Sequence, residues 1–195
     1  MKTQIYFVLG PTASGKSKFA LNLAEKLNGE IINADSMQIY RELSILTARP
    51  TLEDQKKVNH HLYGFVKGDV RFNVQKWCEE ASKKINYLAH KNITPILVGG
   101  TGLYIESLIN GIVSIPSIPE KVKIESEKMI LKIGKENFFN LVKELDSDAM
   151  INIAPNDIQR IRRIWEVNFF TKKKFSEWKK NKNKNFINLK NYKIL

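Results

Sequence analysis

The chain has 195 residues, of which 43% are apolar, and its 32 basic and 20 acidic residues give a formal net charge of +12. That length suits one sizeable domain with a small insertion, and the apolar fraction excludes a chain that is disordered throughout. A single cysteine, Cys78, excludes an internal disulfide and favours a reducing compartment, and no apolar run reaches the length of a membrane span. We therefore expect a soluble, cytoplasmic protein with no membrane partner.

Short apolar runs alternate with helical patterns along the first 110 residues. Apolar runs predict buried strands at 4–9, 30–33 and 94–98. Apolar residues that recur every three or four positions predict helices at 17–27, 74–88 and 103–109. Strands that alternate with helices predict an α/β fold, in which helices flank a parallel sheet.

The pattern changes after a proline-containing stretch at 114–119. Two charged helical segments follow, at 120–132 and 135–145, and a further helix begins at Asn156. A last strand is predicted at 192–195. We expect three parts, namely a catalytic core, a small helical insertion and a return to the core, at 1–113, 114–153 and 154–195.

The positive charge gathers at one end of the chain. Residues 160–195 hold three arginines, nine lysines and two glutamates, a net +10, whereas residues 1–159 carry only +2. Such a segment favours a polyanionic partner such as nucleic acid. The alternative is a solvated run in which lysine and asparagine simply accumulate, as they do at 179–185.

The segment after the first predicted strand fits the P-loop pattern G-x-x-x-x-G-K-[ST] at every fixed position and precedes a predicted helix. Glycines let backbone N–H groups surround phosphate oxygens, and the start of the helix adds favourable partial charge. Lys16 supplies a cation to the terminal phosphates, and Ser17 offers its hydroxyl to Mg²⁺. We expect these residues to bind a phosphate chain, which the family resemblance described below implies to be a diphosphate: Gly10, Pro11, Thr12, Ala13, Ser14, Gly15, Lys16 and Ser17.

Two further strand ends are expected at the same edge of the sheet. The strand at 94–98 ends in glycines and carries no acid there, which argues against a hydrolase motor. Asp35, after the second strand, is better placed to hold a metal or to accept a proton. Its alternative role is to cap a turn, and Thr101 could likewise belong to a simple tight turn.

Three arginines stand at the start of the helix that begins near Asn156. Cations at that end oppose the helix dipole, so we expect an anion to compensate them. Arg160 and Arg163 share one face and Arg162 is turned away from it, and phosphate contact is favoured over a solvated face. His60 and His61 have no partner at metal-ligand spacing, so we expect structural roles for them. Other residues at helical spacing are expected in the core: Trp77, Phe138 and Phe139.

Together these segments resemble the tRNA dimethylallyltransferases, which prenylate the adenosine just 3′ of the anticodon. The matching stretches run in the same order along the chain: GPTASGKS (10–17), ADSMQIYR (34–41), TARPT (47–51), HHLYG (60–64), LVGGTGLY (97–104) and NDIQRIRRIWEV (156–167). The resemblance implies a P-loop NTPase-like parallel sheet with a helical insertion that contacts tRNA. It also implies a monomeric enzyme whose substrates are dimethylallyl diphosphate and the anticodon stem-loop of tRNA.

The resemblance assigns roles to individual residues. Asp35 would take a proton from the N6 amine, Thr101 would position the reacting groups, and Lys16, with Mg²⁺ on Ser17, would stabilise the departing diphosphate. The target base would lie extruded against the Asp35–Gln38 segment. The residues implied to contact tRNA are Asp35, Ser36, Met37, Gln38, Thr101, Lys123, Gln159, Arg160, Ile161, Arg162 and Arg163.

This chain also departs from the family pattern. Leu46 replaces the usual glycine before TARPT, and the usual Thr-Gly-Lys-Pro turn reads Thr-Lys-Lys-Lys at 171–174. Family members continue further, so we expect the chain to lack their C-terminal part. Two alternatives therefore stay open: an adenylate prenyltransferase or small-molecule kinase on the same scaffold, and a non-catalytic remnant that binds tRNA.

Overall fold

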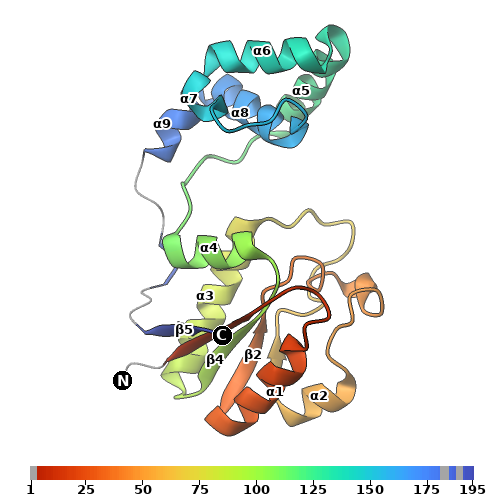
Figure 1. Ribbon diagram of the computed structural model, residues 1–195, viewed down its shortest axis with the longest axis vertical. Coiled ribbons are helices and arrows are strands. Elements are labelled where there is room, and N and C mark those ends of the chain that lie inside the picture. The colour runs from red at the N-terminus through yellow and green to blue at the C-terminus, as the bar shows by residue number, and fades with distance from the viewer. Residues whose placement is uncertain (1–3, 181–184, 188–190) are drawn as a thin grey trace. The chain divides into compact units, whose positions relative to one another are not determined.

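The computed structural model describes residues 4–180, 185–187 and 191–195 (Figure 1). The chain forms two compact units, one made of Met1–Ile112 with Asn185–Leu195 and the other of Val113–Lys184. Most of the Lys/Asn-rich run, at 181–184, lies outside the described residues. Among the described helices, none is both long and apolar enough to cross a membrane.

The first unit is built on a five-stranded sheet in the order β3-β2-β4-β1-β5, with every neighbouring pair parallel. The strands are β1 (Ile5–Leu9), β2 (Gly29–Asn33), β3 (His60–His61), β4 (Thr94–Gly99) and β5 (Tyr192–Ile194). The predicted α/β class is confirmed, and so are the four predicted strands. β3 is too short to leave an apolar pattern in the sequence, and only its pairing with Ile31 and Ile32 defines it.

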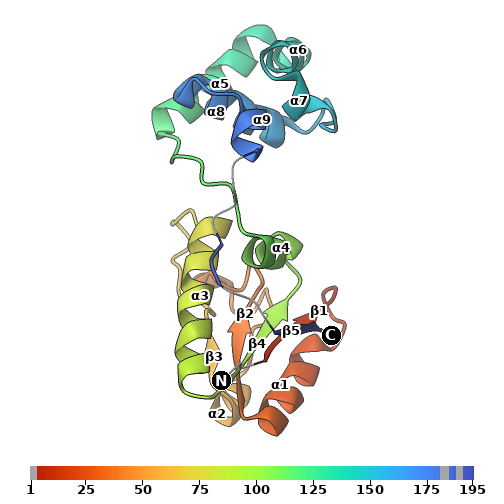
Figure 2. The same cartoon turned by 90° about the vertical axis from the view of Figure 1, so that its left-hand side faces the viewer.

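Helices cover both faces of this sheet, and Figure 2 shows α1 (Lys16–Leu27) and α3 (Val74–His90) on opposite sides of it. Because side chains alternate along a strand, Val8 on β1 packs in the cluster that contains α1 residues. Its neighbour Phe7 packs instead in the cluster of α3 and α4 (Gly102–Asn110). The connection from β2 to β3 contains a short 3₁₀ turn at Arg41–Leu43 and α2 (Leu52–Lys57).

The second unit is helical, and its own core joins residues of every long helix in it. Its helices are α5 (Glu120–Ile133), α6 (Lys135–Leu145), α7 (Ser147–Met150), α8 (Ile158–Thr171) and α9 (Phe175–Lys179). Val122, Phe138, Ile161 and Trp165 are buried together in that core. Phe139 packs at its margin and is half-buried.

The boundary expected at residue 154 therefore differs from the observed one. The apolar face of α8 packs on α5 and α6, so the helix belongs to the second unit and only Asn185–Leu195 returns to the first. The sequence pattern gave the correct apolar face of α8, but an apolar stripe does not say which partner covers it.

Candidate functional site

The P-loop connects the end of β1 to the start of α1, as the motif predicts. Ala13 and Gly15 have left-handed backbone angles, with φ of 63° and 80°, and these turns wrap the loop ahead of the helix. Gly10 lies so close to Ser14 that an added Cβ would stand 2.9 Å from its Oγ. The first turn of α1 has no acidic residue and no side-chain cap, so its N–H groups are available to an anion.

The P-loop side chains carry the charge and the hydroxyl that a diphosphate site needs. Lys16 Nζ donates to the carbonyl of Pro11 at 2.8 Å, which holds the ammonium over the loop. Ser17 is exposed at the start of α1. Both residues line one cavity of about 620 Å³ together with Asp35.

Asp35 is held by the side chain of Asn33, the last residue of β2. Asn33 is fully buried, its Oδ1 accepts from the N–H of Asp35 at 2.9 Å, and its Nδ2 donates to the carbonyl of Asp35 at 3.0 Å. The same Nδ2 donates to Leu62 O at 3.1 Å, and Trp77 Nε1 donates to the carbonyl of Asn33 at 3.0 Å. Sequence reasoning missed Asn33; a polar residue at the end of an apolar strand was the available signal.

The carboxylate of Asp35 has one engaged oxygen and one free one. Its Oδ1 accepts from Met37 N at 2.8 Å, so Asp35 does cap a turn, as the alternative interpretation expected. Among the described residues, Oδ2 accepts no hydrogen bond, and the residue is half-buried at the cavity wall. The turn role and a proton-accepting role are therefore compatible.

Thr101 joins the end of β4 to the segment after β2. Its Oγ1 accepts from Ser36 N at 2.9 Å and lies 3.3 Å from Ser36 Oγ, and its N–H donates to the carbonyl of Ala34 at 3.3 Å. The close approach depends on Gly99, where an added Cβ would stand 2.2 Å from Ala34 backbone atoms. The structure thus brings Asp35, Ser36 and Thr101 together at the carboxyl ends of adjacent strands.

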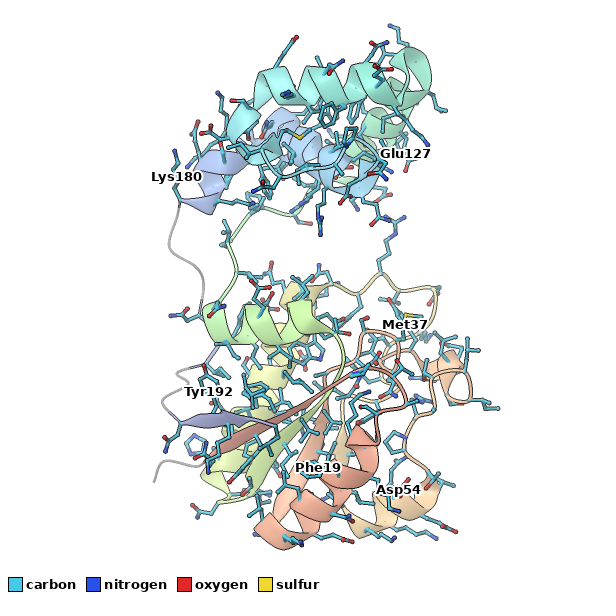
Figure 3. The ribbon with its side chains drawn as sticks, viewed as in Figure 1. Phe19, Met37, Asp54, Glu127, Lys180 and Tyr192 are labelled. Carbon is cyan, nitrogen blue, oxygen red and sulfur yellow. The ribbon has the colours of Figure 1, made fainter. Side chains whose placement is uncertain are left out.

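Most of the remaining cavity wall comes from the segment after β2, and Val98 and Gly99 at the end of β4 supply the rest. Met37 is exposed there (Figure 3), and Gln38 is fixed by a bond from its Nε2 to the carbonyl of Thr47 at 2.7 Å. Leu46, Thr47 and Ala48 complete the lining. We did not select these three residues from the sequence, although two of them belong to the TARPT stretch.

Two groups beside Asp35 stay protonated. Burial raises the pKa of the Tyr63 phenol, and the Asp35 carboxylate raises it further. Burial also raises the pKa of Tyr104 to about 12. Neither phenol therefore supplies a base near neutral pH.

The histidine pair has the structural role that the sequence predicts. His60 Nδ1 lies 2.7 Å from the carbonyl of Val58, and His61 Nε2 lies 2.5 Å from Glu30 Oε2. Burial lowers the pKa of both rings, although the bond to Glu30 partly offsets this at His61. The described residues contain no group of three or more His, Cys, Asp or Glu that could hold a metal ion.

A magnesium ion at the P-loop does not need such a group. Mg²⁺ commonly takes one or two protein oxygens and fills its shell with water and substrate phosphates. Ser17 Oγ and the Asp35 carboxylate line the same cavity, so the oxygen donors present fit this ion.

The second unit carries the other predicted contacts, on α8 and α5. Arg160 is exposed, and its Nη1 lies 2.9 Å from Asp157 Oδ2. Asp157 also caps the helix by accepting from the N–H of Arg160 at 3.1 Å, which supplies part of the negative charge expected there. Gln159 and Arg163 are exposed beside it, and Lys123 on α5 pairs with Glu120 at 2.7 Å.

Two of the residues predicted to contact tRNA, Ile161 and Arg162, are not exposed. The Ile161 side chain is fully buried in the core of the second unit, so the expectation that it contacts RNA through this side chain is wrong. Arg162 is turned inward, where it pairs with Glu127 at 2.9 Å and Glu166 at 3.5 Å and donates from Nε to Ser126 Oγ at 3.1 Å. Its guanidinium braces α8 on α5.

Comparison with known proteins gives matches over the whole chain. Residues 38–195 match the family model described as IPP transferase, and residues 3–71 match the one described as isopentenyl transferase. A tRNA dimethylallyltransferase of Pelagibacter ubique is 47% identical over 177 residues, which are 91% of this chain and 56% of the relative. Another, from Rickettsia felis, is 39% identical over 194 residues, 100% of this chain and 63% of the relative.

Solved structures agree with these matches. A eukaryotic dimethylallyltransferase acting on tRNA has a TM-score of 0.79 at 28% identity, over 99% of this chain and 47% of that chain. A tRNA isopentenylpyrophosphate transferase from Bacillus halodurans has a TM-score of 0.57 at 33% identity, over 87% of this chain and 56% of that chain. The present chain spans little more than half the length of the curated relatives it matches.

Proposed function

The chain belongs to the IPP transferase family, and on that premise we propose that it transfers a dimethylallyl group from dimethylallyl diphosphate to tRNA. The acceptor would be the exocyclic N6 of the adenosine 3′ of the anticodon, position 37, and diphosphate would be released. We further propose that the chain works in the cytoplasm as a monomer, where its buried Cys78 thiol stays reduced.

One observation carries the proposal: a single cavity is lined by the P-loop and by the only carboxylate among its lining residues. Lys16, Ser17 and Asp35 all face that space of about 620 Å³. A diphosphate on the P-loop would therefore place its allylic carbon within the same cavity as a proton acceptor. The relatives' names support tRNA as the acceptor over free adenylate or a small molecule.

The reaction would be a single displacement at the allylic carbon. The lone pair of the adenine N6 forms the new C–N bond while the C–O bond to diphosphate breaks, and the bonding pair leaves with the diphosphate. The N6 proton passes to the free oxygen of Asp35, whose other oxygen holds the Met37 turn. Thr101, through Ser36, would fix the segment that receives the base.

The leaving group gains negative charge as the bond breaks. The Lys16 ammonium and the N–H groups at the start of α1 would stabilise that charge from fixed positions. Mg²⁺, held by Ser17, would supply further positive charge at the phosphates.

The acceptor would be bound through both units. Asp35–Gln38 and Thr101 would contact the extruded base, and Lys123, Gln159, Arg160 and Arg163 would contact phosphates. Arg162 would act indirectly, because its ion pairs hold α8 in place.

Transfer of radiolabelled dimethylallyl groups to tRNA in the presence of Mg²⁺ tests these assignments. Asp35→Asn keeps an oxygen for the Met37 turn but removes the proton acceptor, and we expect transfer to slow by about 10²–10⁴-fold. Lys16→Ala should slow transfer and weaken donor binding. Asp69→Asn changes an exposed aspartate of the same unit and should leave the rate unchanged.

Undiminished transfer by Asp35→Asn would overturn the assigned base. Binding of tRNA by the parent chain, with no product at high protein concentration, would favour the non-catalytic remnant instead. Mg²⁺-dependent prenylation of free AMP, or ATP turnover, would favour the remaining alternatives.

A further inference from the structure

The lysines that follow α8 form a separate basic surface on the second unit, which the proposed chemistry does not use. We call it the lysine corner, and its members are Lys172, Lys173, Lys174, Lys179 and Lys180. Four of the five are exposed and Lys173 is half-buried, and Glu177 is the one acid within the segment (Figure 3 labels Lys180). Within the described part of the chain, none of the five pairs with a carboxylate.

The segment that carries the corner is fixed by one buried and two half-buried hydrogen bonds. Asp146 is almost fully buried, and its Oδ2 accepts from the N–H of Ser176 at 3.0 Å. Asn168 Oδ1 accepts from the N–H of Phe175 at 2.6 Å, and Trp178 Nε1 donates to Thr171 Oγ1 at 3.2 Å. α9 is therefore held against the end of α8, and the lysines project from an ordered turn.

Aromatic rings hold three of the ammonium groups in place. Lys172 Nζ lies 4.6 Å from the ring centre of Phe169, Lys173 Nζ lies 4.9 Å from that of Trp178, and Lys179 lies 5.3 Å from that of Phe175. Such contacts restrict the lysine side chains before any partner arrives, so less rotamer entropy is lost on binding.

Lys172 occupies a backbone position that favours glycine. It ends α8 in the left-handed conformation, with φ 55° and ψ 20°, where a side chain is strained. Within the described part of the helical unit, the only contact of the Lys172 ammonium is with the ring of Phe169, so no ion pair in that unit neutralises its charge.

We propose that the lysine corner binds the sugar–phosphate backbone of tRNA, in addition to the contacts assigned to α8. This inference rests on the proposed function for the identity of the RNA. Five cations within nine residues, none of them paired with a carboxylate in the described part of the chain, match the regularly spaced phosphates of a nucleic-acid backbone. A lipid surface would call for an apolar helix face of some length, and α9 has five residues.

The test compares two variants of the full chain that lose the same charge from the same unit. The corner variant is Lys172→Gly/Lys174→Gln/Lys180→Gln. The control variant changes exposed lysines at the α5–α6 turn and on α6: Lys132→Gln/Lys135→Gln/Lys143→Gln. The probe is unmodified tRNA, whose binding is followed by fluorescence anisotropy at several salt concentrations without any prenyl donor.

We expect the corner variant to bind tRNA about tenfold or more weakly near 0.1 M salt, and the slope of log K against log salt to shrink by about 2. The control should change that slope by less than about 0.5. Equal losses in the two variants, an unchanged slope in the corner variant, or a parent chain that does not bind tRNA would each overturn the proposal. The proposal would also be overturned if the corner variant lost binding to phosphatidylglycerol vesicles that the parent chain shows, while its tRNA binding stayed intact.

The single variant Lys172→Gly separates binding from folding. Glycine relieves the left-handed strain, so we expect an equal or higher unfolding temperature together with weaker tRNA binding. Weaker binding with a lower unfolding temperature would indicate a structural role and contradict the proposal. The binding assay contains no prenyl donor, so its result does not depend on catalysis. If the transfer assay gave no product while the corner variant still bound tRNA more weakly than the parent chain, the proposed function would fail and this inference would stand.

Discussion

Asn33→Leu is the most informative single change in the first unit. Leucine has the same branched heavy-atom skeleton as asparagine, with bulkier methyl groups in place of the amide oxygen and nitrogen. It removes three side-chain hydrogen bonds, two to the backbone of Asp35 and one to Leu62 O. Each backbone group left unpaired costs about 1–3 kcal/mol when buried, and the half-buried setting of Asp35 lets water recover part of that. We expect the free energy of unfolding of this unit to fall by about 3 kcal/mol.

Hydrogen exchange measured by mass spectrometry on peptides of β2 and β4 reports that loss separately from the second unit. The control is Asn59→Leu, which removes one exposed side-chain bond to Glu30 Oε1 and should change stability by less than about 0.5 kcal/mol. If the amides of β2 exchange as slowly in Asn33→Leu as in the parent chain, the buried asparagine does not hold Asp35 in the way described.

The remaining predictions concern the strand ends and the pH dependence. Gly99→Ala would place a Cβ 2.2 Å from the backbone of Ala34, so the free energy of unfolding should drop by about 2 kcal/mol or more. Gly102→Ala, with open space around it, should be neutral or stabilising, and equal effects of the two changes would contradict the close approach at Gly99. His61, whose pKa is lowered by burial, binds a proton more readily once unfolded, so urea titrations should show stability falling as the pH drops through about 6.5. His61→Gln should flatten that fall, and an unchanged pH profile in the variant would count against the buried neutral ring.

The sequence was sufficient for the parts of the fold that local pattern determines. In the α/β unit, strands β1, β2, β4 and β5 and helices α1, α3 and α4 follow from apolar runs and spacing, whereas β3 and α2 do not. The P-loop lies where its motif requires, between β1 and α1. The nearness of Asp35 to the P-loop follows from a general property of parallel sheets, whose carboxyl ends meet at one edge.

What the sequence did not predict depends on tertiary partners. The apolar stripe of α8 was evident, but whether it would cover the sheet or the neighbouring helices was not. Ile161 belongs to that stripe, which explains why an implied RNA contact is a core residue. The role of Asn33 and the left-handed angle of Lys172 arise from long-range bonds and from a helix end, which residue type alone does not encode.

The most direct test of the central claim is nucleoside mass spectrometry of tRNA incubated with the 195-residue chain, dimethylallyl diphosphate and Mg²⁺. The account predicts adenosine that has gained one dimethylallyl group, confined to the position just 3′ of the anticodon and lost with Asp35→Asn. Unmodified adenosine at that position, under conditions where the chain is folded and binds tRNA, would contradict it.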